Sequence, residues 1–278
     1  MTTASEVIAC CSGTTKCPRP DAKIWEVFSE DHYKSISETE FFVVKNINPK
    51  NIEKCMQYFQ SEFPLVGFPH LKRIRGRDIL ICPSDGDFSQ KSIEEKIFSA
   101  FSNKNISCEE IEIAKVFVSK NPVLTKQQYS VANGLWPIRL TVPLVDTETS
   151  FSDKKVIEKF QILFDNQAEC MFEKNGIMVF GTCADRASPN HYKHAILNAC
   201  ASVGPVSDYL ATDFEVFLLS EPCLMCSMAL LHSRVARVYY LVHHRFEETK
   251  WGGLGSICSI HANKQLNHRF QVFRVVVD

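Results

Sequence analysis

One pentapeptide constrains the chain more than any other feature: Pro222-Cys223-Leu224-Met225-Cys226. It follows an apolar stretch that predicts a strand, and it opens a stretch with helical character. Two thiols at this spacing converge on one metal ion, and a helix N-terminus stabilises thiolates because its unpaired N–H groups and dipole favour negative charge. The pentapeptide therefore predicts a metal site where a strand gives way to a helix.

A third ligand candidate is His194, which also opens a predicted helix after a polar loop. One histidine and two cysteines would bind zinc and leave its fourth position open, which is typical of catalytic rather than closed structural zinc sites. His191 is the alternative imidazole, three residues earlier and ahead of the helix. Two other interpretations of the cysteines stay open. One is a thioredoxin-like redox pair, although its usual context after the first strand of a βαβ unit is missing, and the other is simple packing.

The residue two positions after His194 decides which chemistry the site can support. Zinc nucleobase deaminases carry His-x-Glu followed by Pro-Cys-x-x-Cys, and their Glu transfers protons without binding the metal. Here Ile196 occupies the Glu position. Isoleucine cannot take a proton from zinc-bound water or return it to a leaving amino group. Glu221 precedes Pro222, but an acid before Pro-Cys belongs to the ordinary deaminase pattern as well, so we do not expect it to replace the missing Glu.

On these residues the sequence resembles the cytidine/deoxycytidylate deaminase superfamily over residues 135–278. Within it, the chain is similar to the catalytically inactive subunit of the eukaryotic heterodimeric tRNA adenosine deaminase. The features that carry this resemblance are His194-Ala195 before an aliphatic residue, Glu221 with the pentapeptide, Asn133-Gly134-Leu135-Trp136-Pro137, and a tail with Gly252-Gly253-Leu254-Gly255-Ser256 and Leu266-Asn267-His268-Arg269-Phe270. An N-terminal extension of this size is also similar to that subunit.

The resemblance implies a three-layer αβα deaminase fold in which His194, Cys223 and Cys226 hold zinc and Ile196 marks a pseudo-catalytic position. It also implies a heterodimer with a catalytic subunit that keeps the Glu. That complex converts the wobble adenosine of certain tRNA anticodons to inosine by hydrolytic deamination. This chain would supply the dimer interface, a structural zinc site and part of the tRNA-binding surface, but it would not transfer the proton.

The first half of the chain predicts a domain of its own. Apolar strand and helix patterns alternate along residues 39–120, which is typical of a small α/β domain of the ferredoxin-like type. Residues 1–38 are expected to form a flexible N-terminal segment. Residues 121–134 contain a proline and several polar side chains and are the predicted linker. The zinc-binding deaminase-like domain is then expected at residues 135–278.

A basic stretch in this first domain is the candidate RNA contact, and it contains Lys72, Arg73, Arg75 and Arg77. If the stretch is a strand, two-residue steps place the three arginines on one face at intervals of roughly 6–7 Å. That spacing suits successive contacts to a phosphate backbone. The alternative interpretation is a solvated edge strand whose charge discourages pairing with other strand edges.

Composition excludes several classes of protein. The 31 Lys and Arg residues balance 32 Asp and Glu residues, which argues against a polycationic nucleic-acid binder but allows a local basic patch. The first 17 residues lack a secretory signal pattern, so we expect the 12 cysteines to be reduced thiols. No apolar run approaches the roughly 20 residues that span a bilayer. We therefore expect no membrane partner and a location in the cytoplasm and nucleus.

The end of the chain is the last candidate site. Val277 and Asp278 follow two further valines, so the C-terminus is apolar but ends in two carboxylates. We hypothesise that it folds back and plugs the pocket beside the fourth zinc position.

Three functions fit the sequence. The first is the non-catalytic tRNA-deaminase subunit that the resemblance implies. The second is an active zinc-dependent nucleoside or nucleotide deaminase with an unrecognised general acid/base, and the third is a zinc-stabilised interaction module without RNA. Ile196 separates the first from the second, because deamination needs a carboxylate at that position. Binding of tRNA separates the first from the third.

Overall fold

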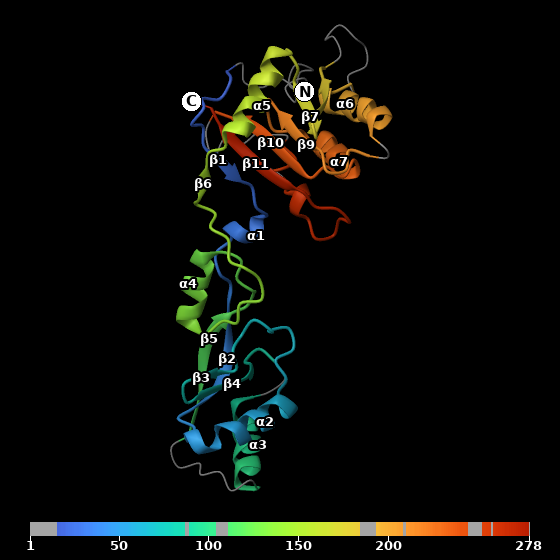
Figure 1. The fold of residues 1–278 in the computed structure, drawn as a ribbon. Helices are drawn as coiled ribbons and strands as arrows, with labels where there is room; N and C mark the ends of the chain where they lie inside the picture. Colours follow the sequence, from blue (N-terminus) through green and yellow to red (C-terminus); the bar gives the residue numbers. More distant parts are fainter. Residues whose placement is uncertain are drawn as a thin grey trace, which may run out of the picture. The chain divides into compact units, whose positions relative to one another are not determined.

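The computed structural model describes residues 16–86, 89–103, 111–183, 193–207, 210–243, 252–256 and 258–277. The chain divides into two compact units (Figure 1). The N-terminal unit comprises Lys34–Asp146, and the C-terminal unit combines the described residues up to Tyr33 with those from Thr147 onward. Within the described residues, no helix has both the length and the apolar character that crossing a membrane requires.

The N-terminal unit contains a four-stranded sheet with the order β3-β4-β2-β5, in which all neighbours are antiparallel. Its elements are β2 (Glu38–Lys45), η2 (Pro49–Asn51), α2 (Ile52–Glu62), β3 (Ile74–Arg75), β4 (Asp78–Pro83), α3 (Gln90–Asn103), β5 (Glu112–Ser119) and α4 (Lys126–Leu135). Up to β5 this is the β-α-β-β-α-β succession of ferredoxin-like domains. The fold class predicted for this part of the chain is confirmed.

Both faces of this sheet are covered, because alternate residues of β2 point to opposite sides. Phe42 and Val44 pack with α2 and α3 in one buried cluster, whereas Phe41 and Val43 pack with α4 and Trp136 in another. Helix α4 begins at Thr125, which forms a reciprocal capping box with Gln128.

The predicted linker at residues 121–134 is therefore wrong, because most of it is this helix. Ala132 is fully buried against the sheet. The motif that ends with Trp136-Pro137 likewise belongs to the N-terminal unit and does not open the second one.

The C-terminal unit is built on a seven-stranded sheet with the order β6-β1-β11-β10-β9-β7-β8. Strands β9, β10 and β11 are parallel neighbours, and the remaining pairs are antiparallel. Its elements are β1 (Ile24–Glu26), α1 (Glu30–Tyr33), β6 (Ser150–Phe151), α5 (Lys154–Asp165), β7 (Cys170–Lys174), β8 (Ile177–Gly181), α6 (Ala195–Val203), η3 (Gly204–Val206), β9 (Glu215–Leu218), α7 (Leu224–His232), β10 (Arg237–Val242), η4 (Ile260–Ala262) and β11 (Gln271–Val276).

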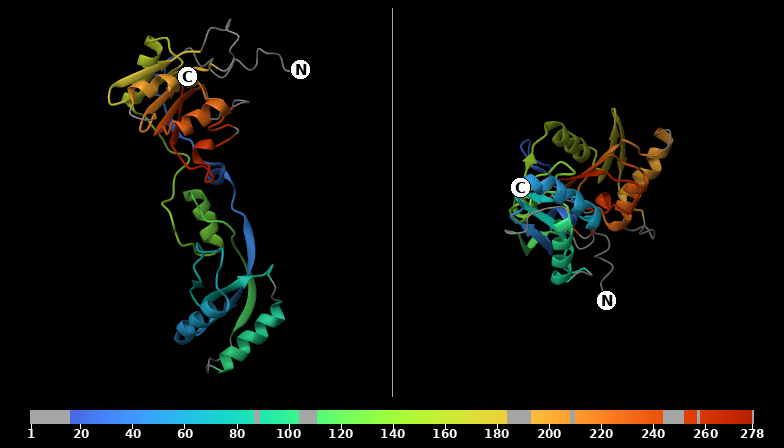
Figure 2. Two further views of the ribbon diagram at one scale, coloured as in Figure 1. Left: turned by 90° about the vertical axis from the view of Figure 1, so that its right-hand side faces the viewer. Right: turned by 90° about the horizontal axis from the view of Figure 1, so that it is seen from below.

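Helices cover both faces of this sheet, so the predicted three-layer αβα architecture is confirmed. Along β10, Tyr240 belongs to the cluster that includes α6 and α7, and Tyr239 belongs to the cluster that includes α5. Helices α6 and α7 lie side by side in Figures 1 and 2. The turn between β7 and β8 uses Asn175 and Gly176 at φ of 52° and 85°, as the Asn-Gly pair predicts for a tight hairpin.

The predicted flexible segment at residues 1–38 is wrong for a part that the structure describes. Ile24 is fully buried and pairs with Val275 of β11 on one side and with Phe151 of β6 on the other. Three residues are too few to show an alternating pattern, and their pairing partners lie far away in the sequence. The sheet therefore incorporates a strand for which the sequence carries no local signal.

Candidate metal centre

Two helix starts bring the three predicted ligands together. His194 is the N-cap residue of α6 and Cys223 is the N-cap residue of α7, and both have the extended backbone of an N-cap. Neither side chain makes a capping hydrogen bond, so both point elsewhere. Cys226 follows one turn into α7 and is buried. Because α7 comes directly after the parallel strand β9, the cluster lies where ligands of α/β sheets usually bind, at the carboxyl ends of the strands.

The distances fit a tetrahedral metal site. The Nδ1 atom of His194 lies 3.3 Å from Sγ of Cys226 and 3.7 Å from Sγ of Cys223. All three ligand atoms lie within 4.8 Å of one another. Tetrahedral zinc with its usual bond lengths would separate a nitrogen from a sulfur ligand by about 3.6 Å. The structure thus brings together the residues that the sequence predicted; the alternative ligand His191 lies outside the described residues.

The pseudo-catalytic position is an apolar part of the core. Ile196 lies in the first turn of α6 with 5% of its surface exposed. It belongs to the same buried cluster as Cys226 and Leu230 of α7. The side chain therefore contributes to the packing between the two helices that carry the ligands.

Glu221 is held by four donors and is not free for proton transfer. Its Oε1 atom accepts hydrogen bonds from the backbone N–H groups of Leu254, Gly255 and Ser256 at 3.1, 2.7 and 3.0 Å. Its Oε2 atom accepts one from the hydroxyl of Ser256. Only 5% of the residue is exposed. Successive N–H groups that converge in this way form an anion-binding nest, so the carboxylate fixes the loop.

The contact of Glu221 with residues 254–256 brings the glycine-rich segment next to the pentapeptide that contains Cys223 and Cys226. A Cβ atom at Gly252 would overlap the carboxyl group of Glu221, and one at Gly253 would overlap the side chain of Ser227. Gly252 also forms a bridge with Cys223, and the N–H of Gly253 donates to the carbonyl of Pro222 at 2.9 Å. Residues 252–256 therefore close over the start of α7.

A buried histidine lies in the same part of the unit. His261 contacts the carbonyl of Val27 through Nε2 at 2.8 Å, and no partner is found for its Nδ1 among the described residues. Burial lowers the pKa of this imidazole. We therefore assign it as a neutral side chain that ties η4 to the segment after β1.

The family comparison agrees with this geometry. The family model "Cytidine and deoxycytidylate deaminase zinc-binding region" matches residues 166–242, a range that contains all three ligands. The chain thus carries a zinc-binding region of the cytidine/deoxycytidylate deaminase type, and the ligand triad lies within it.

Three relatives resemble the chain, and two of them extend the likeness beyond this region. The Arabidopsis thaliana "tRNA-specific adenosine deaminase TAD3" is 48% identical over 69 residues, which are 25% of this chain and 16% of that protein. The mouse "probable inactive tRNA-specific adenosine deaminase-like protein 3" is 22% identical over 91% of this chain and 88% of its own length. The Schizosaccharomyces pombe "tRNA-specific adenosine deaminase subunit tad3" is 26% identical over 85% of this chain and 84% of its own. The two longer alignments reach beyond the deaminase domain into the N-terminal unit.

The hypothesis of a C-terminal plug is wrong for Val277. The N–H of Val277 donates to the carbonyl of Val242 at 2.8 Å, so the chain continues along the sheet beyond β11. The side chain packs with Val275 and Phe160 in the cluster that includes α5, whereas the metal ligand Cys226 belongs to the cluster that includes α6 and α7. Alternation along the strand places Val277 on the face away from the metal centre. Asp278 lies outside the described residues.

The predicted row of three arginines on one strand face is also wrong. Strand β3 is only two residues long, and Gly76, at a φ of 61°, turns the chain before Arg77. Arg73 donates to the carbonyls of Phe59 and Phe63, at 3.0 and 2.7 Å. These carbonyls lie at the C-terminal end of α2, where the helix dipole makes a cation favourable.

The other two arginines also have structural contacts. Arg75 lies over the ring of Trp136 at 4.4 Å and donates to the carbonyl of Leu135. Arg77 donates to the carbonyls of Asn46 and Ile47. Contact of these arginines with RNA stays a prediction, but their guanidinium groups already serve the fold.

Two exposed cations in the N-terminal unit lack such contacts. Lys72 and Arg139 are exposed, and neither side chain makes an ion pair or hydrogen bond with another described residue. The chain brings them together because Lys72 donates its N–H to the carbonyl of Pro137 and Arg139 donates its N–H to the carbonyl of His70. Sequence reasoning selected Lys72 but missed Arg139, which is isolated in the sequence and becomes part of a basic site only through this pairing.

Proposed function

We propose that this chain is the non-catalytic subunit of a tRNA adenosine deaminase that converts the wobble adenosine to inosine. The observation that carries the proposal is an intact ligand triad beside a buried Ile196 at the position of the catalytic Glu. The names of the relatives, a "probable inactive" deaminase-like protein and a deaminase "subunit", support it.

Zinc is the metal that the ligand set favours, since two thiolates and one imidazole are typical zinc donors. His194, Cys223 and Cys226 would hold it. Bound zinc supplies a Lewis acid that can activate water, but the chain's own side chains cannot complete the reaction. Ile196 offers no proton acceptor, and the carboxylate of Glu221 is occupied by four donors. We therefore assign the metal site of this chain a structural role.

The catalytic partner would supply the missing carboxylate in a heterodimer, and the N-terminal unit would contribute to tRNA binding. Support for the RNA contact comes from the two exposed cations, Lys72 and Arg139, which electrostatic attraction draws toward phosphates. We expect the complex to act in the cytoplasm and nucleus, which imaging of a tagged chain in cells would test.

The deciding experiment measures inosine at the wobble position. The purified chain alone should produce none, and the complex with its catalytic partner should deaminate the tRNA. A complex whose partner has lost its motif glutamate should be inactive although this chain is unchanged. If that variant complex still makes inosine, this chain carries an acid/base of its own and the proposal fails.

A matched variant tests the same point from the side of this chain. Ile196→Val keeps an apolar residue in α6 and should leave the deamination rate of the complex unchanged. Its metal content and its tRNA binding should also be unchanged. If Ile196→Val lost tRNA binding while the metal content stayed intact, the result would contradict this expectation. Failure of the purified complex to bind tRNA at all would favour the alternative of an interaction module without RNA.

A further inference from the structure

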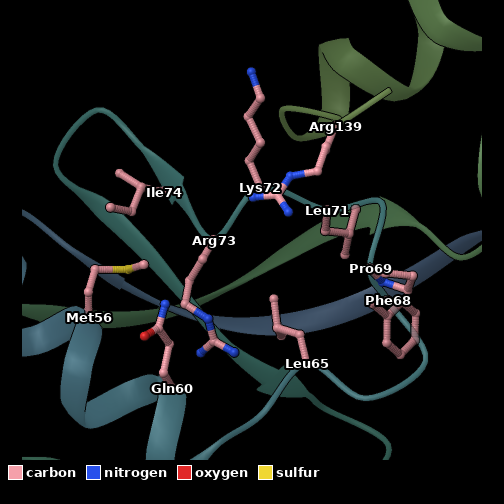
Figure 3. A pocket seen from close by; sticks show the side chains of 10 residues that line it. All are labelled: Met56, Gln60, Leu65, Phe68, Pro69, Leu71, Lys72, Arg73, Ile74 and Arg139. Carbon is pink, nitrogen blue, oxygen red and sulfur yellow. The ribbon is translucent and has the colours of Figure 1, made fainter. Parts of the chain in front are cut away.

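The N-terminal unit contains a pocket that is separate from the metal centre. Its volume is about 410 Å³, which lies within the usual range of roughly 300–1,000 Å³ for ligand pockets. The pocket lies between the end of α2 and the segment that enters β3 (Figure 3). The lining residues are Met56, Gln60, Leu65, Phe68, Pro69, Leu71, Lys72, Arg73, Ile74 and Arg139.

The charge of this pocket is entirely positive. Three of the ten lining residues are cations, Lys72, Arg73 and Arg139, and none is acidic. Arg73 is partly buried, and its guanidinium contacts carbonyl oxygens, so no carboxylate among the described residues neutralises it. Arginine stays protonated even where burial lowers the pKa of its guanidinium, as it does here. The pocket is therefore complementary to an anion.

Backbone pairing places the two outer cations on one face of the paired segments. Leu71 and Ile138 form an antiparallel bridge and are both buried, so the residues that follow them point the opposite way. Those residues are Lys72 and Arg139, which are diagonal neighbours on the same face of the bridge. In Figure 3 the ammonium group of Lys72 extends away from the guanidinium group of Arg139. The indole N–H of Trp136 donates to the carbonyl of Lys72 at 2.6 Å and holds this arrangement.

The remaining wall is apolar and carries one amide. Met56, Leu65 and Phe68 contribute sulfur, aliphatic and aromatic surface, and Gln60 adds a donor and an acceptor at the end of α2. Phe68 is held edge-on against Phe41, with 4.9 Å between the ring centroids. A ligand that suits this pocket has a negative group at one end and a flat, largely apolar group at the other.

We propose that the pocket binds one unpaired nucleotide of an RNA chain, with its phosphate against Lys72 and Arg139 and its base against the apolar wall. Unpaired nucleotides are the part of RNA whose bases can leave the stack and enter a pocket. The inference rests on the proposed function, in which the chain contributes to tRNA binding. It adds a defined subsite to what would otherwise be general electrostatic attraction.

A pair of isosteric substitutions on α2 tests the pocket itself. Gln60→Glu introduces a negative charge in the pocket, and Gln57→Glu introduces the same charge on the same helix outside it. In the complex with the catalytic partner, Gln60→Glu should weaken tRNA binding by about tenfold, the change expected for the loss of one charge-assisted contact. Gln57→Glu should change it less than twofold. Equal effects of the two substitutions would overturn the proposal.

Substitution of the cations tests the phosphate contact. Lys72→Gln and Arg139→Gln should each weaken tRNA binding and reduce the slope of log affinity against log salt by about one. Lys91→Gln, an exposed lysine on α3 outside the pocket, is the matched control and should leave the slope unchanged. Unchanged slopes for both pocket variants would contradict the assignment.

Competition with small ligands tests whether the pocket binds a nucleotide of an RNA chain or a free nucleotide. Adenosine 5′-monophosphate or cytidine 5′-monophosphate should compete with tRNA at millimolar concentrations, and inorganic phosphate should compete less well because it lacks the base. A nucleotide that binds the full chain but is not displaced by tRNA would overturn the RNA assignment. If instead the pocket variants bind tRNA normally while the complex makes inosine, this proposal fails and the proposed function stands.

Discussion

Replacing Glu221 should damage the metal centre without touching a ligand. Glu221→Ala removes an acceptor that serves three backbone N–H groups and one hydroxyl, all in the loop at residues 254–256. Those N–H groups are largely shielded from water, since Leu254 is fully buried. A buried N–H group that loses its acceptor cannot bind water instead, so the full cost of its desolvation is no longer compensated.

The expected magnitude follows from the number and type of these bonds. Hydrogen bonds to a charged acceptor contribute about 1.5–3 kcal/mol each, but bonds to one carboxylate are not additive and water can enter the vacated space. Removing one partner from a buried charged network typically costs about 3–5 kcal/mol. For a unit of this size, that corresponds to a fall in melting temperature of about 6–20 °C. Glu221→Gln keeps an oxygen but loses the charge, and it should cost less than Glu221→Ala.

The assay combines thermal unfolding of the full chain with measurement of bound zinc. Glu221→Ala should lower both the melting temperature and the zinc content, because the loop contacts Pro222 and Cys223. Glu215→Ala is the matched control, since its ion pair with Arg237 is exposed and should contribute less than about 1 kcal/mol. If Glu221→Ala has the same melting temperature as Glu215→Ala and retains its zinc, the carboxylate does not organise the metal centre and the reasoning is refuted.

Three further predictions concern the metal, a histidine and an arginine. Cys226→Ser should abolish stoichiometric zinc binding and destabilise the C-terminal unit, whereas Cys200→Ser, outside the triad, should retain the metal in elemental analysis. Burial lowers the pKa of His261, so on acidification this imidazole is protonated more readily in the unfolded chain than in the folded chain. Stability is therefore fully present above about pH 6.5 and falls as the solution is acidified. Melting temperatures between pH 7.5 and 5 should show this fall in the wild type and a weaker one in His261→Gln, and parallel curves would count against it. Arg75→Ala should cost about 1–2 kcal/mol in denaturant unfolding through lost contact with Trp136, and Arg75→Lys should restore only part of it.

The features that the sequence predicted correctly are those encoded locally. The cysteine spacing and the histidine at a helix start are each recognised from residues within a few positions of one another, and the structure confirms how they are placed. The ferredoxin-like order of strands and helices could also be predicted, because the spacing of apolar residues within each element indicates whether it is a strand or a helix. Local patterns identified the three ligands, but their meeting is a long-range contact, since His194 lies 29 and 32 positions before Cys223 and Cys226.

The features that were missed depend on partners far away in the sequence. Arg73 contacts carbonyls at Phe59 and Phe63, and a run of alternating arginines cannot reveal those acceptors. The acceptor for the glycine-rich loop is Glu221, which lies 33–35 positions before the donors. Arg139 likewise becomes part of a basic pocket only when its segment pairs with residues around Lys72. In each case tertiary pairing, which has no local signature, decides what the side chain does.

The proposed metal ligands would have a structural role that does not need a catalytic acid. His194 and Cys223 are the N-cap residues of two nine-residue helices, and neither makes the side-chain hydrogen bond that usually stabilises such an end. Zinc bound by both residues and by Cys226 would fix the two helix starts relative to each other, so losing it should cost stability as well as any chemistry. Ile196 adds to this stability, because a buried aliphatic side chain contributes about 1.5–3 kcal/mol of apolar burial between the same helices. The proposed non-catalytic role is therefore consistent with a chain that has the ligand triad with Ile196 buried beside it.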